Sequence, residues 1–242
     1  MPDWLTAEVA EVIPETPRVA TLALRVADWP GHLPGQHLSV RLTGEDGYQA
    51  QRVYSIASAP EEPLLELTVE QIAEGEVSPY LVGELRAGDR FEVRGPIGRH
   101  FVWTHDLGGP LFLIAGGSGV VPLMAMLRHR AAAGSRVPAV LLYSSRTAAD
   151  VIYREELERL AGAGDGLRVV HTLTREQPPA WTGYARRIDG AMLAGVGFPP
   201  SERPHVFICG PGGLVEMAGQ RLLDLGHTPE RIKTERFGPS GS

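Results

Sequence analysis

One four-residue segment carries three side chains that together could hold a planar, phosphorylated ligand. Arg52-Val53-Tyr54-Ser55 supplies a guanidinium, an aromatic ring and a hydroxyl. On a strand, Arg52 and Tyr54 point to one face. The guanidinium can bind phosphate through two hydrogen bonds, the ring can stack on a flat ring system, and the hydroxyl can bond a ring nitrogen. In isolation, an exposed Arg/Tyr stripe on a barrel strand is the simpler interpretation.

A glycine-rich turn lies where a second ligand with phosphate groups could bind. Gly117-Ser118-Gly119 follows the apolar run 111–115 and leads through Pro122 into a helical pattern. Backbone N–H groups and the helix dipole at such a turn can bind a diphosphate, and glycines let it approach closely. Pro122 stands where the common GxGxxG pattern has a small residue. A tight turn without a ligand is therefore an equal alternative.

Two further segments offer candidate binding groups at the ends of elements. Cys209-Gly210-Pro211 ends the apolar run 205–209. Ligands in open α/β sheets bind beyond the carboxyl ends of the strands, so Cys209 could line the pocket of a dinucleotide's reactive ring. Taken alone, Cys209 is better interpreted as a small buried hydrophobe. The residues from Gly75 to Ser78 precede a short helix and offer either a second anion-binding N-terminus or plain capping.

Several arginines follow the strands expected in the second half of the chain. Arg146 comes after the second of these strands, where the adenine ribose of a dinucleotide would lie, so its guanidinium could accommodate a 2′-phosphate. Arg175, Arg186 and Arg187 are further candidates for this contact. Solvated loop arginines explain each of them equally well.

The segments that contain these residues fall into two different sequence patterns. Residues 1–104 contain one predicted helix, at 78–85, with Ser78 as its N-cap and Pro79 as its first helical residue. Short strands between Pro and Gly turns are predicted at 7–13, 19–26, 37–42, 51–57, 64–69 and 90–94. This spacing is typical of an antiparallel sandwich or barrel.

Residues 110–242 alternate apolar runs with helical segments. Strands are predicted at 111–115, 137–143, 167–173, 205–209 and 232–236, and helices at 122–133, 153–160 and 213–225. Buried strands that alternate with helices indicate a mainly parallel sheet covered on both faces. The sequence therefore predicts an all-β antiparallel domain, residues 1–104, followed by an α/β domain, residues 110–242.

Composition excludes several classes of protein. A formal net charge of −6 over 242 residues argues against a general nucleic-acid binder. The single cysteine excludes an intramolecular disulfide and a cysteine-ligated iron–sulfur cluster, and the histidine spacing indicates no metal site. No apolar run reaches the roughly 20 residues of a membrane span, and no signal-peptide pattern is present. We expect a cytoplasmic protein without a metal.

The segments taken together resemble the ferredoxin–NADP⁺ reductase family of two-domain flavoprotein reductases. Arg52-Val53-Tyr54-Ser55 resembles the family's RxYS flavin motif, Gly117 to Pro122 its GxGxxP turn, and Cys209-Gly210-Pro211 its CGP nicotinamide motif. Pro34-Gly35-Gln36 and Gly95-Pro96-Ile97-Gly98 resemble its PGQ and GPxG segments. The resemblance covers nearly the whole chain and implies a flavin-binding Greek-key barrel followed by a nucleotide-binding α/β domain.

The resemblance also implies a role for each of these residues. The expected flavin is FAD, with Tyr54 stacked on the isoalloxazine, Ser55 near N5 and Arg52 on the diphosphate. The other expected flavin contacts are Val53, Thr68, Val69, Gly75, Val77 and Ser78. Cys209 would lie near C4 of the nicotinamide. The other expected dinucleotide contacts are Gly117, Ser118, Gly119, Pro122, Ser145, Arg146, Arg175, Arg187, Gly210 and Pro211.

The C-terminal segment departs from the plant-type pattern of the family, in which a final Tyr covers the flavin. Here Glu235-Arg236-Phe237-Gly238 is followed by Pro239-Ser240-Gly241-Ser242. Phe237 is the expected shield over the flavin, and Glu235 is the expected polar neighbour of the reacting rings. Ser145, Arg146 and Arg175 resemble 2′-phosphate contacts of NADPH-using relatives, so NADPH is the expected donor, with NADH as the alternative.

The resemblance implies hydride transfer to the flavin and then single-electron transfer to another protein. Because no ferredoxin module is present in the chain, we expect a separate acceptor, which is an iron–sulfur protein, a flavodoxin, a haem protein or a molybdenum enzyme. A free-flavin or quinone reductase, an electron-transfer subunit of a larger complex and a nucleotide sensor that has lost its flavin remain alternatives.

Overall fold

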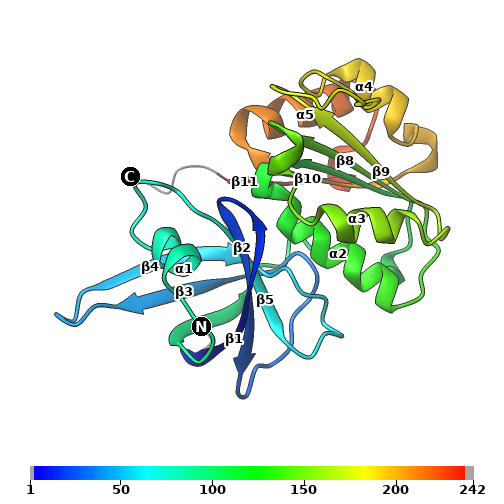
Figure 1. Cartoon of the computed structure of the whole chain (residues 1–242). Helices are drawn as coiled ribbons and strands as arrows, with labels where there is room; N and C mark the ends of the chain where they lie inside the picture. Colours follow the sequence, from blue (N-terminus) through cyan, green and yellow to red (C-terminus); the bar gives the residue numbers. More distant parts are fainter. Residues whose placement is uncertain (1–2, 238–242) are drawn as a thin grey trace.

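The computed structural model describes residues 3–237, and its first half is a curved antiparallel sheet (Figure 1). The strand order is β4-β3-β6-β1-β2-β5. The strands are β1 (Leu5–Thr16), β2 (Val19–Val26), β3 (His37–Thr43), β4 (Gln49–Ser55), β5 (Leu65–Glu70) and β6 (Arg90–Ile97), with the short helix α1 (Ser78–Gly83) after β5. A bridge between Ile56 and Leu67 joins the chain after β4 to β5, so the two outer strands meet and the sheet closes like a barrel.

The second half is a parallel sheet between two layers of helices (Figure 1). Its strands lie in the order β11-β10-β7-β8-β9. They are β7 (Leu111–Gly116), β8 (Ala139–Ser145), β9 (Leu167–Leu173), β10 (His205–Pro211) and β11 (Ile232–Phe237). Helices α2 (Val120–Ala132) and α3 (Arg154–Ala161) cover one face, and α4 (Gly190–Val196) and α5 (Gly212–Asp224) cover the other. The strand order reverses between β7 and β10, which is where ligands bind in open α/β sheets.

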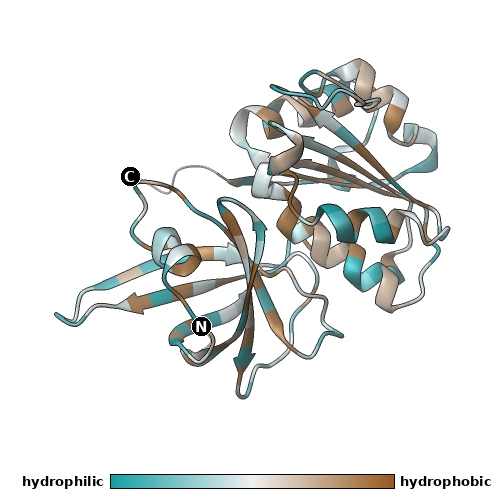
Figure 2. Cartoon of the chain, in the orientation of Figure 1, coloured by the Kyte–Doolittle hydropathy of each residue, from teal (hydrophilic) through white to brown (hydrophobic). Residues whose placement is uncertain are grey.

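Hydrophobic burial explains the two-layer arrangement of this half. Figure 2 shows that the central strands are mostly hydrophobic, whereas α3 carries a hydrophilic outer side. All six residues of β7 are buried, as expected for a central strand with helices on both faces. Phe112 and Ile114 pack toward α4 and α5, and Leu113 and Ala115 pack toward α2 and α3. Side chains that alternate in direction thus fill two separate cores.

The structure confirms the predicted fold class and corrects several details. The predicted N-cap, Ser78, is wrong: the cap is Val77, and the Ser78 hydroxyl accepts a hydrogen bond from the Ile72 N–H at 3.0 Å. Helix α4 was not predicted, because two glycines within it weaken the helical pattern; its signal was Asp189, which caps it through the Met192 N–H. Short 3₁₀ helices also lie at His105–Leu107, Gly117–Gly119, Ala148–Asp150, Pro200–Glu202 and Pro229–Arg231.

Two features are absent from the part of the chain that the structure describes. No helix between residues 3 and 237 is long and apolar enough to cross a membrane. The same residues contain no group of three or more His, Cys, Asp or Glu side chains arranged to bind a metal ion. The predicted domain boundary near residues 104–110 stays a prediction.

Candidate functional site

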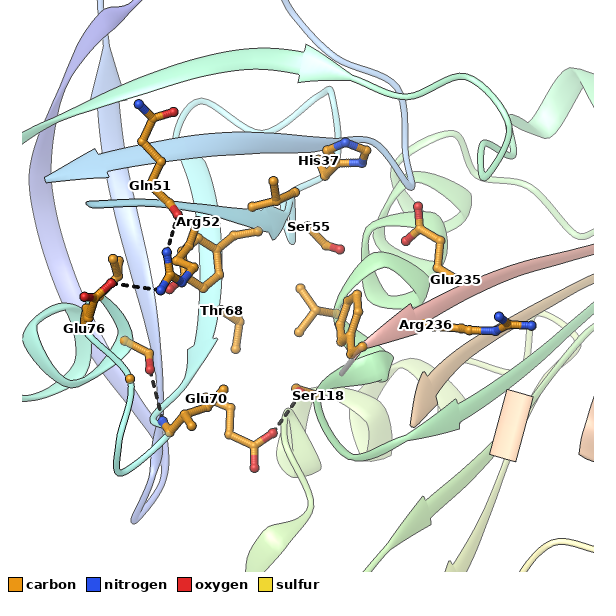
Figure 3. A pocket seen from close by; sticks show the side chains of 18 of the residues that line it. His37, Gln51, Arg52, Ser55, Thr68, Glu70, Glu76, Ser118, Glu235 and Arg236 are labelled. Atoms are coloured by element: carbon orange, nitrogen blue, oxygen red, sulfur yellow. Dashed lines mark hydrogen bonds and ion pairs between the residues drawn. The ribbon is translucent and has the colours of Figure 1, made fainter. Parts of the chain in front are cut away.

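A pocket of about 1010 Å³ opens where the two halves of the chain meet (Figure 3). One side comes from β3, β4, β5 and the segment before α1, and the other from the glycine-rich turn, the start of α2 and β11. Small-molecule sites usually occupy roughly 300–1,000 Å³, so this pocket has room for a ligand of dinucleotide size. Both the RxYS-like strand and the glycine-rich turn therefore border one space.

Arg52 extends from β4 toward the segment before α1. Its guanidinium donates to the Glu76 carboxylate at 3.0 Å and to the Gln51 carbonyl at 2.7 Å. Glu76 also accepts from the Tyr48 hydroxyl at 3.1 Å. A carboxylate and a phosphate offer a guanidinium the same paired oxygen acceptors. A diphosphate bound along this segment would therefore compete with Glu76 for Arg52.

Tyr54 and Ser55 lie deeper in the same strand. Burial raises the pKa of Tyr54 to about 12, so its phenol stays neutral near pH 7 and the ring can act as an apolar stacking surface. Ser55 is buried at the end of β4, opposite His37 of β3, and both side chains line the pocket. Burial lowers the pKa of His37, which favours a neutral imidazole. Sequence reasoning missed His37, although it follows directly on the PGQ segment.

Two of the polar groups in the loop between β5 and α1 form hydrogen bonds within the loop itself. The Gly75 N–H donates to the Ile72 carbonyl at 2.9 Å. In this structure the amide is therefore not free to bind an anion, which is the role that the sequence predicted for it. The Ser78 hydroxyl is likewise engaged with the Ile72 N–H. Glu76 and Val77 remain the candidates for backbone contacts in this segment, and both line the pocket.

The glycine-rich turn and the CGP segment pack backbone against backbone. A Cβ atom on Gly119 would lie 2.3 Å from the Cys209 carbonyl oxygen, and one on Gly210 would lie 3.0 Å from the Gly116 carbonyl oxygen. Only glycine permits such an approach. The two segments therefore form one continuous surface at the point where the strand order reverses, and this glycine-lined turn fits the close approach of a diphosphate.

Cys209 and Glu235 are direct neighbours on adjacent parallel strands. Cys209 is fully buried, and burial, with the Glu235 carboxylate as a second cause, raises the pKa of its thiol. Burial also raises the pKa of Glu235 to about 7. Glu235 points into the pocket in Figure 3. The pair therefore consists of a neutral thiol and a carboxyl that titrates near neutral pH.

Phe237 lies at the end of β11, paired with Pro211 and bordering the pocket. Arg236 precedes it and extends in another direction from Glu235 (Figure 3). The predicted placement of the tail from Gly238 onward lies outside the described residues.

A hydrogen bond joins the glycine-rich turn to the barrel. The Ser118 hydroxyl donates to the Glu70 carboxylate at 2.8 Å, and both residues border the pocket (Figure 3). Thr68, two residues earlier on β5, borders it as well, whereas Val69 points into the barrel core. Glu70 was not predicted, because a lone polar residue at a strand end carries no motif. Pro122 is buried in the first turn of α2.

The predicted 2′-phosphate contacts lie in the loops that follow β8 and β9. The Arg175 N–H donates to the Arg146 carbonyl at 2.9 Å, so these two loops are joined. Ser145 is buried at the end of β8, while the Arg146, Arg175 and Arg187 side chains are at least partly exposed. Arg186 instead pairs with Asp189 at 2.8 Å. The structure thus brings Arg146 and Arg175 to one edge of the sheet.

Family models match both halves of the chain. One, described as an oxidoreductase FAD-binding domain, matches residues 7–102. The other, described as an oxidoreductase NAD-binding domain, matches residues 113–220.

Individual proteins resemble the chain along most of its length. Ferredoxin–NADP reductase B of Sorangium cellulosum is 34% identical over 96% of this chain and 96% of its own length. The ferredoxin reductase component of 3-ketosteroid-9-alpha-monooxygenase from Mycobacterium tuberculosis is 32% identical over 96% of this chain, and the chain spans 65% of its length. The crystal structure of the flavohem-like FAD/NAD binding domain of nitric oxide dioxygenase from Vibrio cholerae superposes with a TM-score of 0.85 at 26% identity, covering 97% of this chain and 99% of that chain.

Proposed function

Because the chain belongs to the ferredoxin–NADP⁺ reductase family, we propose that it passes electrons from NADPH through FAD to a separate one-electron acceptor protein. The chain is an oxidoreductase with an FAD-binding and a nicotinamide-dinucleotide-binding half, so the predicted family, enzyme class and cofactors are confirmed. The observation that carries the proposal is the single pocket bordered by Arg52, Tyr54 and Ser55 on one side and by Ser118, Glu235 and Phe237 on the other.

The proposed flavin contacts follow from the chemistry of this pocket. Arg52 would bind the diphosphate by exchanging Glu76 for phosphate oxygens, and the Glu76 and Val77 amides would add donors. The neutral Tyr54 ring would stack against the flavin ring, and the buried Ser55 hydroxyl would bond its polar edge. Phe237 would cover the face of the flavin ring that lies toward the second half. A bound flavin supplies the ability to accept a hydride and release electrons one at a time.

The proposed dinucleotide contacts lie across the pocket. The turn from Gly117 to Gly119 would hold the diphosphate, with Gly210 and Pro211 beside it. The neutral Cys209 and the titrating Glu235 would border the nicotinamide without giving or taking a proton in the hydride step. Ser145, Arg146, Arg175 and Arg187 would hold the adenosine end, and their three guanidinium groups favour NADPH over NADH.

We propose that the electron acceptor is a separate protein, and the name of one relative supports this. The relative from Mycobacterium tuberculosis is named as the ferredoxin reductase component of 3-ketosteroid-9-alpha-monooxygenase. For this chain we propose the same arrangement, in which the acceptor is an iron–sulfur, flavodoxin, haem or molybdenum protein.

The proposal is tested by comparing acceptors under one set of conditions. The FAD-loaded protein is supplied with NADPH and either a ferredoxin, cytochrome c or free flavin, and the rate of acceptor reduction is followed against acceptor concentration. We expect reduction of one-electron protein acceptors, with free flavin a poor substrate. Efficient reduction of free flavin that saturates at low concentration, together with inactivity toward every protein acceptor, would instead make the chain a flavin reductase.

A further inference from the structure

Strand β5 meets the α/β half through a single polar face. Its alternate residues Glu66, Thr68 and Glu70 point to one side, as strand geometry requires. Glu66 pairs with Arg128 of α2 at 2.6 Å, Thr68 accepts a hydrogen bond from the Tyr153 hydroxyl, and Glu70 accepts one from Ser118 at 2.8 Å. Each partner belongs to the other half of the chain. One strand face thus carries three consecutive contacts across the junction.

Arg128 is the most densely bonded residue of this junction. Its side chain is 10% exposed. Besides Glu66, its guanidinium donates to the Ala57 carbonyl at 3.0 Å and to both oxygens of Glu156, at 2.7 and 3.1 Å. A guanidinium is always charged, and here it lies between a carboxylate of β5 and one of α3. Arg128 therefore joins the two halves through one carboxylate from each.

Tyr153 forms a second link through a closed ring of hydrogen bonds. Its N–H donates to Glu15 at 3.1 Å, and its hydroxyl donates to Thr68. Thr68 lies 2.7 Å from the Thr21 hydroxyl, which donates to the other Glu15 oxygen at 2.8 Å. Tyr153 adopts a φ of 59°, an unusual value for a residue other than glycine. Such a conformation persists only where the surroundings hold it in place.

The links act on the same elements that border the pocket. Helix α2 begins directly after the glycine-rich turn, and Arg128 lies about 12 Å further along it at 1.5 Å per residue. Its partner Ala57 follows Ser55 by two residues. Thr68 and Glu70 line the pocket themselves. A shift of β5 against α2 would therefore move the flavin contacts relative to the dinucleotide contacts.

We propose that Arg128 and Tyr153 are positioning residues, which dock β5 on the α/β half and thereby set the separation between the flavin and the nicotinamide. The kinetic part of this inference rests on the proposed function. Hydride transfer is sensitive to such placement, because a misplacement of about 1 Å by a distant mutation can lower a rate about a hundredfold.

The test compares two buried tyrosines that differ in what they bond. Tyr153→Phe removes a hydroxyl that crosses the junction. Tyr143→Phe removes one that accepts from the Ile152 N–H, within the α/β half. Both tyrosines are buried, so the substitutions are matched in chemistry and burial. The measured quantities are the rate of flavin reduction at saturating NADPH under anaerobic conditions and the dissociation constants of FAD and NADP⁺.

We expect Tyr153→Phe to lower the reduction rate about tenfold while both dissociation constants stay within about twofold, because only placement has changed. Tyr143→Phe should leave the rate within about twofold. Equal rates for the two variants would overturn the positioning role. A loss confined to the dissociation constants would overturn it as well.

A second pair of variants tests the junction without any cofactor. Glu66→Ala removes the carboxylate that reaches Arg128 across the junction, and Glu156→Ala removes one within the α/β half. Hydrogen exchange of β5 amides should accelerate about tenfold or more in Glu66→Ala and less in Glu156→Ala, since a segment opens more readily where the hydrogen bonds that hold it are removed. Equal protection of β5 in both variants would contradict the docking. If wild-type protein with bound FAD is reduced by neither dinucleotide, the proposed function fails, but this exchange result still decides the docking.

Discussion

At the scale of single residues, Glu235 is a carboxyl whose protonation state changes near neutral pH. Burial raises its pKa from 4.5 to about 7. The folded protein therefore binds this proton more tightly than the unfolded chain between about pH 4.5 and 7. Stability falls as the pH rises through that window, and the loss is complete above it.

Glu235→Gln should remove this pH dependence, because an amide does not titrate. Between pH 5 and 8 we expect wild type to lose of the order of 2–3 kcal/mol more stability than the variant, at about 1.4 kcal/mol per pKa unit. Urea unfolding at the two pH values measures the difference. Parallel losses in both proteins would show that the Glu235 pKa is ordinary.

Glu70 places a negative charge beside the turn that we assign to the dinucleotide diphosphate. Glu70→Gln keeps an oxygen that can accept from Ser118 but removes the charge. We expect NADP⁺ to bind several-fold more tightly to the variant, with the gain shrinking as salt screens the charges. Titration calorimetry at low and high salt measures this. Unchanged or weaker affinity at low salt would mean that the phosphates bind elsewhere.

At the scale of elements, two glycines in one turn should respond very differently to a methyl group. A Cβ on Gly119 would meet the Cys209 carbonyl oxygen at 2.3 Å, whereas a Cβ on Gly117 would meet nothing within 4 Å, although its φ is +54°. Gly119→Ala must push the turn away from β10, while Gly117→Ala costs only about 1–2 kcal/mol of backbone strain.

We therefore expect Gly119→Ala to lose roughly tenfold or more in NADP⁺ affinity, since only about 1.4 kcal/mol of distortion suffices for that factor. Gly117→Ala serves as the control, because its backbone strain is the same with and without the dinucleotide and so lowers stability rather than affinity. Calorimetric titration of both variants gives the comparison, and tight binding by Gly119→Ala would contradict the assigned turn.

Some strands and helices could be predicted from local sequence patterns, and others could not. Continuous apolar runs such as 111–115 predict buried parallel strands because both faces must be covered, and β7 follows that run closely. Helix α4 was not predicted because its two glycines weaken the helical pattern. Ser78 was wrongly predicted as an N-cap because its hydroxyl accepts from the Ile72 amide instead. The Arg52 and Gly119 segments could be proposed as phosphate contacts from the sequence because phosphate chemistry demands particular residue types at short spacing.

Contacts that form only when distant segments meet leave no local pattern. His37, Glu70 and Arg128 are single polar residues within ordinary elements. Arg128 and Glu66 are 62 residues apart, so no local spacing links them. Their contacts form only where the barrel and the parallel sheet meet in the folded chain.

At the scale of the whole molecule, the choice of dinucleotide tests whether one ligand spans the sheet edge from the pocket to the β8 and β9 loops. Arg146→Ala should raise the KM for NADPH about tenfold or more and leave NADH use unchanged, because a charge-assisted hydrogen bond contributes about 1.5–3 kcal/mol. Arg186→Ala is the control, since Arg186 already pairs with Asp189. Equal effects on both dinucleotides would remove the 2′-phosphate role.

In the proposed mechanism, one pocket brings bound FAD and a nicotinamide dinucleotide together. Anaerobic titration of the FAD-loaded protein with NADPH, followed by the visible absorbance of the oxidised flavin, measures whether the two cofactors meet. We expect complete loss of that absorbance with one NADPH consumed per bound FAD. A protein that binds no FAD, or whose bound flavin stays oxidised with both NADPH and NADH, would contradict it.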